Sequence, residues 1–221
     1  MSSRRLRIDV FFDFICPWCL IGKRQLEHAQ VQFRSRHPDV QVTTVWHGVQ
    51  LLPQLPVQGE PFADFYRKRL GNAEAMTMRQ AQVQQAAAAV GLTIDFSRIE
   101  TMPNTADAHR LFERVSVLGN ATQREMLLER LFAAYFRKRE NLGCRETLLA
   151  IARSCGVDAQ VVLDCLKGDA TPFDGFPGAT SGVPGFQFDR RMTMVGAQPA
   201  QALLGAMNQA LKESDHERQP A

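Results

Sequence analysis

The 221-residue sequence contains no run of 18 apolar residues, so it predicts no membrane-spanning helix. The apolar stretch after Arg4-Arg5-Leu6-Arg7 is short and is interrupted by Asp9 and Asp13, which does not resemble a signal peptide. Charges are well mixed around a net charge of +3, and nothing indicates a nucleic-acid surface. There is no internal repeat. We therefore expect a globular, cytoplasmic protein, in which structural disulfides are rare.

The five cysteines do not have the spacing of a metal site. Cys16 and Cys19 form a close pair, but a zinc site needs two more ligands, usually a second close pair. Cys144, Cys155 and Cys165 are widely spaced, and no pair of histidines lies three to five residues apart. The sequence thus predicts no metal and no organic cofactor. Inert core cysteines are the other alternative, but Cys16 lies at a helix start rather than on an apolar helix face.

The three later cysteines have ordinary structural interpretations. Cys155 and Cys165 continue apolar helix faces, so both are expected to be small buried hydrophobic residues. A Cys155–Cys165 disulfide is the alternative, which a reducing compartment disfavours. Cys144 is expected in a loop or at a helix start.

The most informative segment of the sequence is Cys16-Pro17-Trp18-Cys19. It follows a strand-like run, Ile8–Phe12, and precedes a helix-like run, Leu20–Phe33. A Cys-x-x-Cys at a strand-to-helix junction is typical of a dithiol/disulfide redox site. Pro17 suits the first helical position, because its φ is already helical and its missing N–H is not needed there.

The two cysteines are predicted to be chemically unequal. Cys16 would cap the helix and face its unpaired amides, which favour a thiolate. Cys19 begins a helical face with 3-4-3-4 spacing, formed by Cys19, Gly22, Leu26, Ala29 and Phe33. We therefore expect an exposed attacking Cys16 and a buried resolving Cys19. Lys23 falls mainly off that face and is expected in solvent.

Strands are predicted only near the two ends of the chain. Leu6–Asp13 and Val40–Trp46 are the first two, and Gly185 opens a β-hairpin that turns at Asp189-Arg190-Arg191. Helices are predicted between and after them, at Phe62–Leu70, Thr77–Val90, Thr105–Leu118, Thr122–Arg139, Arg145–Ser154, Ala159–Leu166 and Pro199–Lys212.

This order predicts an α/β fold with a mixed sheet. The first β-α-β should be a parallel, right-handed unit, and the hairpin adds antiparallel strands. The helical block is too long for a simple crossover, so residues 62–181 should be an all-helical insertion. Residues 1–61 and 182–221 would then form one discontinuous sheet domain. Cys16 would lie at the carboxyl end of the first strand, where open sheets bind ligands.

Gly182-Val183-Pro184 precedes the predicted hairpin and has two interpretations. An ordinary trans proline is the base-rate expectation. The alternative is a cis proline that turns the backbone of Val183 toward the cysteines, where it could pair with an extended substrate. Spacing alone leaves both open.

The segment Val10–Lys23 resembles the active-site segment of DsbA-family thiol oxidoreductases, specifically the FrnE-like subgroup. Gly182-Val183-Pro184 resembles that family's cis-proline loop. Three further segments are similar to family landmarks and follow in the same order: Pro103-Asn104-Thr105 with His109-Arg110, Ala134-Tyr135-Phe136, and Val195–Pro199.

The resemblance implies a thioredoxin fold with a helical insertion, a thiol–disulfide redox role and a cis Pro184. It also implies glutathione-using relatives, the kappa-class glutathione transferases and 2-hydroxychromene-2-carboxylate isomerases. Those tend to carry Ser at the position of Cys16, so both cysteines together favour an oxidoreductase. The chain departs from the family pattern at the short Gly/Pro-rich segment 168–181, at Gly185 and at His47-Gly48, which leaves the substrate unassigned.

Four further residues are candidates near the site. Trp18 is expected to influence the redox poise and shape the contact surface. Asn104 and His109 are candidate pocket residues, with glutathione as the candidate ligand of His109. The general expectation for His109 is a polar surface or boundary histidine. Asp13 could tune the thiol or simply end the strand, and the second interpretation is favoured.

The predicted activity is thiol–disulfide exchange by Cys16 and Cys19, with Pro17, Trp18, Val183 and Pro184 contacting the substrate. The substrate would be a protein or small-molecule thiol or disulfide, with glutathione as a candidate cosubstrate. A glutathione-dependent isomerase or transferase is the first alternative, and a non-enzymatic interaction module is the second. The direction of electron flow, and whether the chain is a monomer or a homodimer, are left open.

Overall fold

The computed structural model describes residues 4–175 and 181–218. It divides into two compact units. Unit 1 comprises residues 1–12, 18–47 and 176–221, and unit 2 comprises residues 13–17 and 48–175. The sequence predicted one sheet domain of residues 1–61 and 182–221 and one insertion of residues 62–181. These boundaries resemble those of the two units, but they stay a prediction.

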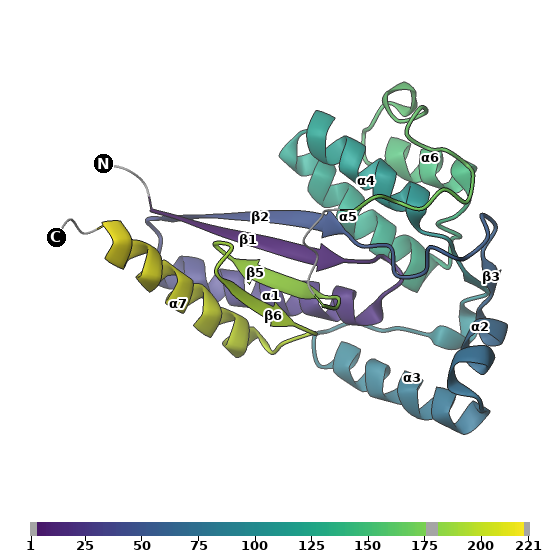
Figure 1. The fold of residues 1–221 in the computed structure, drawn as a ribbon, viewed down its shortest axis with the longest axis horizontal. Helices are drawn as coiled ribbons and strands as arrows, with labels where there is room; N and C mark the ends of the chain where they lie inside the picture. The colour runs from purple at the N-terminus through teal and green to yellow at the C-terminus, as the bar shows by residue number, and fades with distance from the viewer. Residues whose placement is uncertain (1–3, 176–180, 219–221) are drawn as a thin grey trace. The chain divides into compact units, whose positions relative to one another are not determined.

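Unit 1 contains a four-stranded sheet with the strand order β2-β1-β5-β6. In Figure 1 the arrows of β1 and β2 point the same way, as predicted for the first β-α-β. β5 pairs antiparallel with both β1 and β6, which makes the sheet mixed. The elements of this unit are β1 (Arg4–Phe12), α1 (Pro17–Arg36), β2 (Val40–Gly48), β5 (Gly185–Phe188), β6 (Met192–Val195) and α7 (Ala200–Arg218).

The predicted hairpin is confirmed and turns where expected. Asp189 and Arg190 have φ angles of 46° and 60°, and the N–H of Arg191 donates to the carbonyl of Phe188 at 3.0 Å, which makes them the two central residues of a β-turn with positive φ. The carboxylate of Asp189 accepts the backbone N–H of Arg7 at 2.7 Å, which ties the turn to β1.

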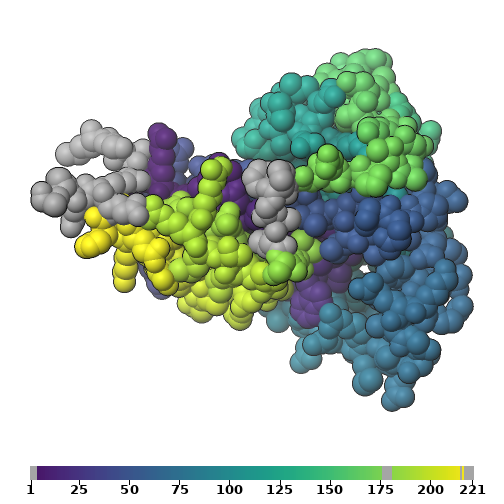
Figure 2. Space-filling view, viewed as in Figure 1, coloured from purple at the N-terminus to yellow at the C-terminus, as the bar shows by residue number. Residues whose placement is uncertain are grey.

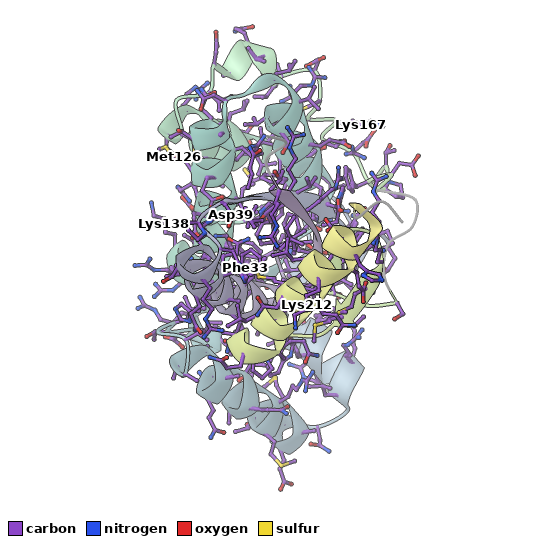
Figure 3. All side chains as sticks on the ribbon, turned by 90° about the vertical axis from the view of Figure 1, so that its left-hand side faces the viewer. Phe33, Asp39, Met126, Lys138, Lys167 and Lys212 are labelled. Carbon is purple, nitrogen blue, oxygen red and sulfur yellow. The ribbon has the colours of Figure 1, made fainter. Side chains whose placement is uncertain are left out.

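One face of the sheet forms the core of unit 1. Alternate residues of β1 pack with α1, β5 and α7 in a single apolar cluster, whose β1 members are Leu6, Ile8 and Val10. α1 and α7 lie side by side, since His37 on α1 and Asn208 on α7 are hydrogen-bonded at 3.0 Å. Phe33 on α1 is fully buried in this cluster, and Figure 3 labels it together with Lys212 on α7. In Figure 2, lime and yellow atoms of β6 and α7 form much of the visible surface of this unit.

Unit 2 is mainly helical (Figure 1). Its elements are β3 (Glu60–Pro61), α2 (Phe62–Leu70), α3 (Ala73–Ala88), the 3-10 turn η1 (Phe96–Arg98), β4 (Thr101–Met102), α4 (Ala106–Leu118), α5 (Ala121–Ala133), the π-helical turn η2 (Ala134–Lys138), α6 (Arg145–Ser154) and the 3-10 turn η3 (Ala159–Val161). The two-residue ladder of β3 with β4 was not predicted.

Local capping explains most differences from the predicted helices. α3 begins at Ala73 rather than Thr77, because the side chain of Asn72 accepts the N–H of Ala75 at 2.7 Å. Asn120 and Gln123 form a reciprocal capping box that starts α5.

The helix predicted over Ala159–Leu166 is wrong, since only the 3-10 turn η3 forms there. In the observed structure the carbonyls of Leu163 and Leu166 accept hydrogen bonds from the guanidinium of Arg145.

Over the described ranges, each helix is either too short or too polar to cross a lipid bilayer.

Candidate active site

Cys16 lies in the turn that links β1 to α1. β1 ends at Phe12, and the N–H of Cys16 donates to the carbonyl of Asp13 at 3.1 Å, which closes a four-residue turn. α1 begins at Pro17, as predicted, so Cys16 immediately precedes the helix and Cys19 is its third residue. This places the two cysteines at the helix end whose amides attract negative charge.

Both cysteines are buried. Cys19 is 1% exposed, as predicted, but Cys16 is only 7% exposed, so the expectation of an exposed Cys16 is wrong. The reason is that the whole turn is buried: Phe14 is 0% exposed and Ile15 is 7% exposed. Pro17 and Trp18 are half-buried.

Lys23 is also buried, which corrects its predicted place in solvent. Its ammonium is paired with the carboxylate of Glu27, one helical turn further along α1. The same nitrogen lies 5.8 Å from the centre of the Trp46 ring. A charge partner and an aromatic face thus allow a lysine to be buried one turn after Cys19.

The peptide bond between Val183 and Pro184 is cis, as the family resemblance implied. Pro184 is buried and Val183 half-buried. A Cβ built on Gly22 would lie 3.0 Å from Cγ of Pro184, so the missing side chain lets α1 approach this loop closely. The structure therefore brings the Pro184 loop against the helix that carries Cys19. Binding of a substrate by Val183 and Pro184 stays a prediction.

Asp13 is fully buried, and its carboxylate accepts hydrogen bonds from four groups. The donors and distances are the N–H of Leu51 at 2.7 Å, Nε2 of His109 at 3.2 Å, Oγ1 of Thr105 at 3.4 Å and the N–H of Ile15 at 3.4 Å. The favoured prediction was that Asp13 simply ends the strand. Asp13 directly follows β1, but the prediction missed these four hydrogen bonds.

His109 is 1% exposed, so the general expectation of a surface or boundary histidine is wrong. Its ring lies between the rings of Phe14 and Phe173, with centroid separations of 5.0 and 5.1 Å. Gly48 provides the space, because a Cβ there would come within 2.4 Å of Nδ1 of His109.

Asn104 is 4% exposed and holds neighbouring backbone in place. Its Nδ2 donates to the carbonyl of Leu55 at 2.7 Å, and its Oδ1 accepts the N–H of Ala106 at 3.0 Å. The sequence indicated a cap at this position, and Asn104 supplies the side-chain bond while Thr105 occupies the N-cap position. A ligand-binding role for Asn104 stays a prediction.

Asn104 is linked through Gln50 to Phe173, and neither Gln50 nor Phe173 was predicted to be a site residue. Oε1 of Gln50 accepts the N–H of Phe173 at 2.7 Å, and Nε2 of Gln50 donates to Oδ1 of Asn104 at 2.9 Å. Phe173 belongs to the Gly/Pro-rich segment 168–181, of which residues 176–180 lie outside the described ranges. No spacing rule links a loop glutamine to a distant loop phenylalanine, so sequence reasoning had no signal for this contact.

Burial and nearby negative charges raise the pKa of two tyrosines in this unit. Burial raises the pKa of Tyr66, and the negative charge of Cys16 raises it further. Burial also raises the pKa of Tyr135 well above its usual value, with the charges of Tyr66 and Asp13 adding to the effect.

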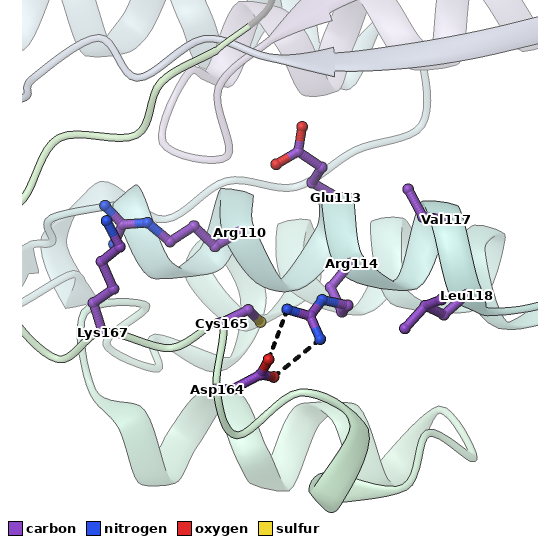
Figure 4. A pocket seen from close by; sticks show the side chains of 8 residues that line it. All are labelled: Arg110, Glu113, Arg114, Val117, Leu118, Asp164, Cys165 and Lys167. Atoms are coloured by element: carbon purple, nitrogen blue, oxygen red, sulfur yellow. Dashed lines mark hydrogen bonds and ion pairs between the residues drawn. The ribbon is translucent and has the colours of Figure 1, made fainter.

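A cavity of about 610 Å³ lies in unit 2 beside α4 (Figure 4). Arg114 and Asp164 form a bidentate ion pair at its wall, with both N–O distances at 3.0 Å. Its lining residues are Arg110, Glu113, Arg114, Val117, Leu118, Asp164, Cys165 and Lys167. None of the sequence-predicted site residues lines this cavity.

Residues 7–172 match the DSBA-like thioredoxin domain family. The chain belongs to this family. The match includes residues 7–12 of β1, the Cys16–Cys19 motif and Asp13 with its four donors. The thioredoxin fold predicted from the sequence is confirmed, including its mixed sheet and helical insertion.

Two relatives and one structure of similar fold can be compared with this chain. The crystal structure of probable DsbA oxidoreductase SCO1869 from Streptomyces coelicolor has a TM-score of 0.81 and 28% identity, over 98% of this chain and 92% of that chain. Uncharacterized protein YwbO from Bacillus subtilis (strain 168) is 27% identical over 69% of this chain and 68% of its own length. A 2-hydroxychromene-2-carboxylate isomerase shares the fold, with a TM-score of 0.61 and 14% identity over 96% of this chain and 100% of that chain.

Proposed function

We propose that this DSBA-like protein is a thiol–disulfide oxidoreductase whose redox couple is Cys16 and Cys19. The observation that carries the proposal is the position of the pair. Cys16 immediately precedes α1, Cys19 lies in its first turn, and both follow β1. The amides of that helix end favour a thiolate at Cys16, and a buried Cys19 is protected from competing reactions.

The reaction begins with the thiolate of Cys16 attacking one sulfur of a substrate disulfide. A Cys16–substrate bond forms while the substrate S–S bond breaks, and the departing thiolate takes a proton from water. Cys19, as a thiolate, then attacks Sγ of Cys16, which releases the second substrate thiol and leaves a Cys16–Cys19 disulfide. The substrate gains two electrons and the protein dithiol loses two.

A thiol reductant completes the cycle, and glutathione is the candidate cosubstrate. Two glutathione thiols reduce the Cys16–Cys19 disulfide and become one oxidised glutathione. Run in reverse, the same steps oxidise a substrate dithiol. The proposed chemistry needs no metal or organic cofactor, and its proposed location is the cytoplasm. Pro17 and Trp18 are half-buried beside the couple and are proposed to contact the substrate, with Val183 and Pro184 binding its backbone.

The test compares three cysteine variants in the glutathione-driven reduction of a small aliphatic disulfide. Cys16→Ser should lose at least a hundredfold in rate, and Cys19→Ala should accumulate a mixed disulfide at Cys16 that mass spectrometry detects. Cys144→Ser is the matched control, because Cys144 lies just before α6, outside the motif. Its rate should equal that of the wild type.

The same variants separate the alternatives. A glutathione-dependent isomerase or transferase would keep its full isomerase or transferase activity in Cys19→Ala, because its reaction has no resolving step. A non-enzymatic interaction module would show no disulfide reduction by the wild type. The direction of electron flow follows from the measured reduction potential of the Cys16–Cys19 couple, since a strongly reducing value excludes an oxidase and an oxidising value excludes a reductase.

A further inference from the structure

Asp13 is the buried carboxylate nearest to Cys16 along the chain. The hydrogen bond from the N–H of Cys16 to the carbonyl of Asp13, at 3.1 Å, defines a turn in which the two Cα atoms lie within about 7 Å. Asp13 is 0% exposed and Cys16 is 7% exposed. Water therefore screens little of any interaction between a carboxylate at one end of this turn and a thiolate at the other.

The four donors to Asp13 come from three different parts of unit 2. Ile15 belongs to the turn itself, Leu51 to the loop after β2, and Thr105 and His109 to the start of α4. Hydrogen bonds to an ionised carboxylate stabilise its charged form. The arrangement therefore fixes the carboxylate of Asp13 at the turn that ends at Cys16.

His109 is the only one of these donors that offers a titratable side chain. Its Nε2 lies 3.2 Å from Oδ1 of Asp13, and both side chains are fully buried. The rings of Phe14 and Phe173 cover its two faces. The donor is thus held in one orientation, and removing it would leave the charge of Asp13 less compensated.

We propose that Asp13 is a positioning residue that sets the reduction potential of the Cys16–Cys19 couple, and that His109 moderates its effect by donating to it. The inference rests on the proposed function. A negative charge held near Cys16 disfavours the thiolate, which destabilises the reduced protein and makes the couple more reducing. Two tyrosines sense these charges in addition to their own burial: the charge of Asp13 adds to the raised pKa of Tyr135, and that of Cys16 adds to the raised pKa of Tyr66.

Asp9 on β1 supplies a control. It is 3% exposed, and its Oδ1 lies 2.6 Å from Nε2 of His47 on β2. It is therefore a second buried carboxylate hydrogen-bonded to a histidine, but it precedes the turn that Asp13 begins and makes none of that turn's hydrogen bonds. Asp9→Asn should affect stability without changing the redox equilibrium.

The experiment equilibrates each full-length variant in buffers of reduced and oxidised glutathione at pH 7 and measures the oxidised fraction of the Cys16–Cys19 pair. Asp13→Asn should shift the equilibrium about tenfold toward the reduced dithiol, which corresponds to about 30 mV for a two-electron couple. Asp9→Asn should stay within twofold of the wild type. Equal values for wild type, Asp13→Asn and Asp9→Asn would overturn the proposal.

A second pair of variants avoids dependence on Asp13→Asn, whose buried amide could prevent folding. His109→Met removes the donor, whereas His109→Gln, of similar length, keeps an N–H group. His109→Met should shift the equilibrium several-fold toward the disulfide, and His109→Gln should return it toward the wild-type value. Identical equilibria for the two variants would show that the hydrogen bond to Asp13 does not tune the couple, and would overturn the proposal.

Failure of the proposed function has a different signature. In that case the wild-type protein itself would form no Cys16–Cys19 disulfide at any ratio of glutathione to its oxidised form. A wild type that titrates normally, with variants that do not shift, would overturn only the role of Asp13 and His109.

Discussion

Arg110 and Asp107 form a hydrogen-bonded ion pair on α4, with an N–O distance of 2.6 Å and each side chain only 9% exposed. The same guanidinium donates to the carbonyl of Pro172 at 2.9 Å and to that of Thr171. One buried arginine thus connects α4 to the segment that supplies Phe173, whose ring covers His109.

Replacing Arg110 by Met should therefore lower the free energy of unfolding by about 3 kcal/mol, because Asp107 would stay buried without its charge partner. Urea denaturation at pH 7 measures the change. Arg67→Met is the matched control, since Arg67 also pairs with an aspartate three residues away, Asp64, but its side chain is 70% exposed. The control should lose less than about 1 kcal/mol. Equal losses would contradict the structural role given to Arg110.

The lowered pKa of Asp9 makes the free energy of unfolding depend on pH in the acid range. Burial alone would raise the pKa of Asp9, but hydrogen bonds from Arg7 and His47 outweigh it and hold the pKa below the usual value. A depressed pKa contributes stability that is present above the ordinary aspartate pKa of about 4 and is lost as the pH falls below it. Asp9→Asn should consequently lose stability at pH 7 and show a shallower decline in urea midpoint between pH 5 and pH 3.

The comparison for Asp9→Asn is Asp39→Asn. Asp39 forms an ion pair with Arg4 at 3.1 Å, but its side chain is 58% exposed. Solvent screens such a pair, so its removal should change the acid dependence less. If the two variants changed the pH profile equally, the buried pairing of Asp9 would not be the source of the effect.

Cys165 is predicted to be an unreactive thiol although it lines the cavity of Figure 4. Burial raises its pKa to about 11, and its Sγ donates to the carbonyl of Val162 at 3.1 Å. Only a small fraction is thiolate at pH 8, and the thiolate is the reactive form. Iodoacetamide at pH 8, followed by peptide mass spectrometry, should leave Cys165 unmodified in the folded protein.

The same labelling in concentrated urea provides the control for Cys165. Unfolding removes the burial, so the thiol should then be alkylated within the same reaction time. Rapid labelling in the folded protein would show that the thiol is not protected as the structure indicates.

Local pattern was sufficient to predict much of the fold. The 3-4-3-4 spacing that begins at Cys19 gave the buried face of α1, and alternation around Asp189-Arg190-Arg191 gave the hairpin. These features depend on neighbouring residues, so a short window of sequence contains the necessary information. The helix predicted over Ala159–Leu166 does not form, and the segment is bonded instead to Arg145, a contact that a short window of sequence does not show.

The layout of the candidate site was predictable in part for the same reason. The Cys-x-x-Cys spacing and Pro17 gave the start of α1, and the places of both cysteines relative to it, from four consecutive residues. The burial of Cys16 and His109 depends on residues far away in the chain, such as Phe173, and a histidine alone does not show whether an aspartate lies opposite it. Asp13 and His109 are 96 residues apart, so only the folded chain shows that they are hydrogen-bonded.

The central claim, that Cys16 and Cys19 act as a dithiol couple, is tested most directly by trapping the mixed disulfide. Wild type, Cys16→Ser and Cys19→Ala are each incubated with oxidised glutathione, quenched in acid and analysed by peptide mass spectrometry. If the two cysteines form a dithiol couple, the wild type contains an internal Cys16–Cys19 disulfide and Cys19→Ala contains a glutathione adduct on Cys16. Cys16→Ser contains neither product. A wild type that forms no internal disulfide, or an adduct found equally on Cys144 and Cys16, would contradict it.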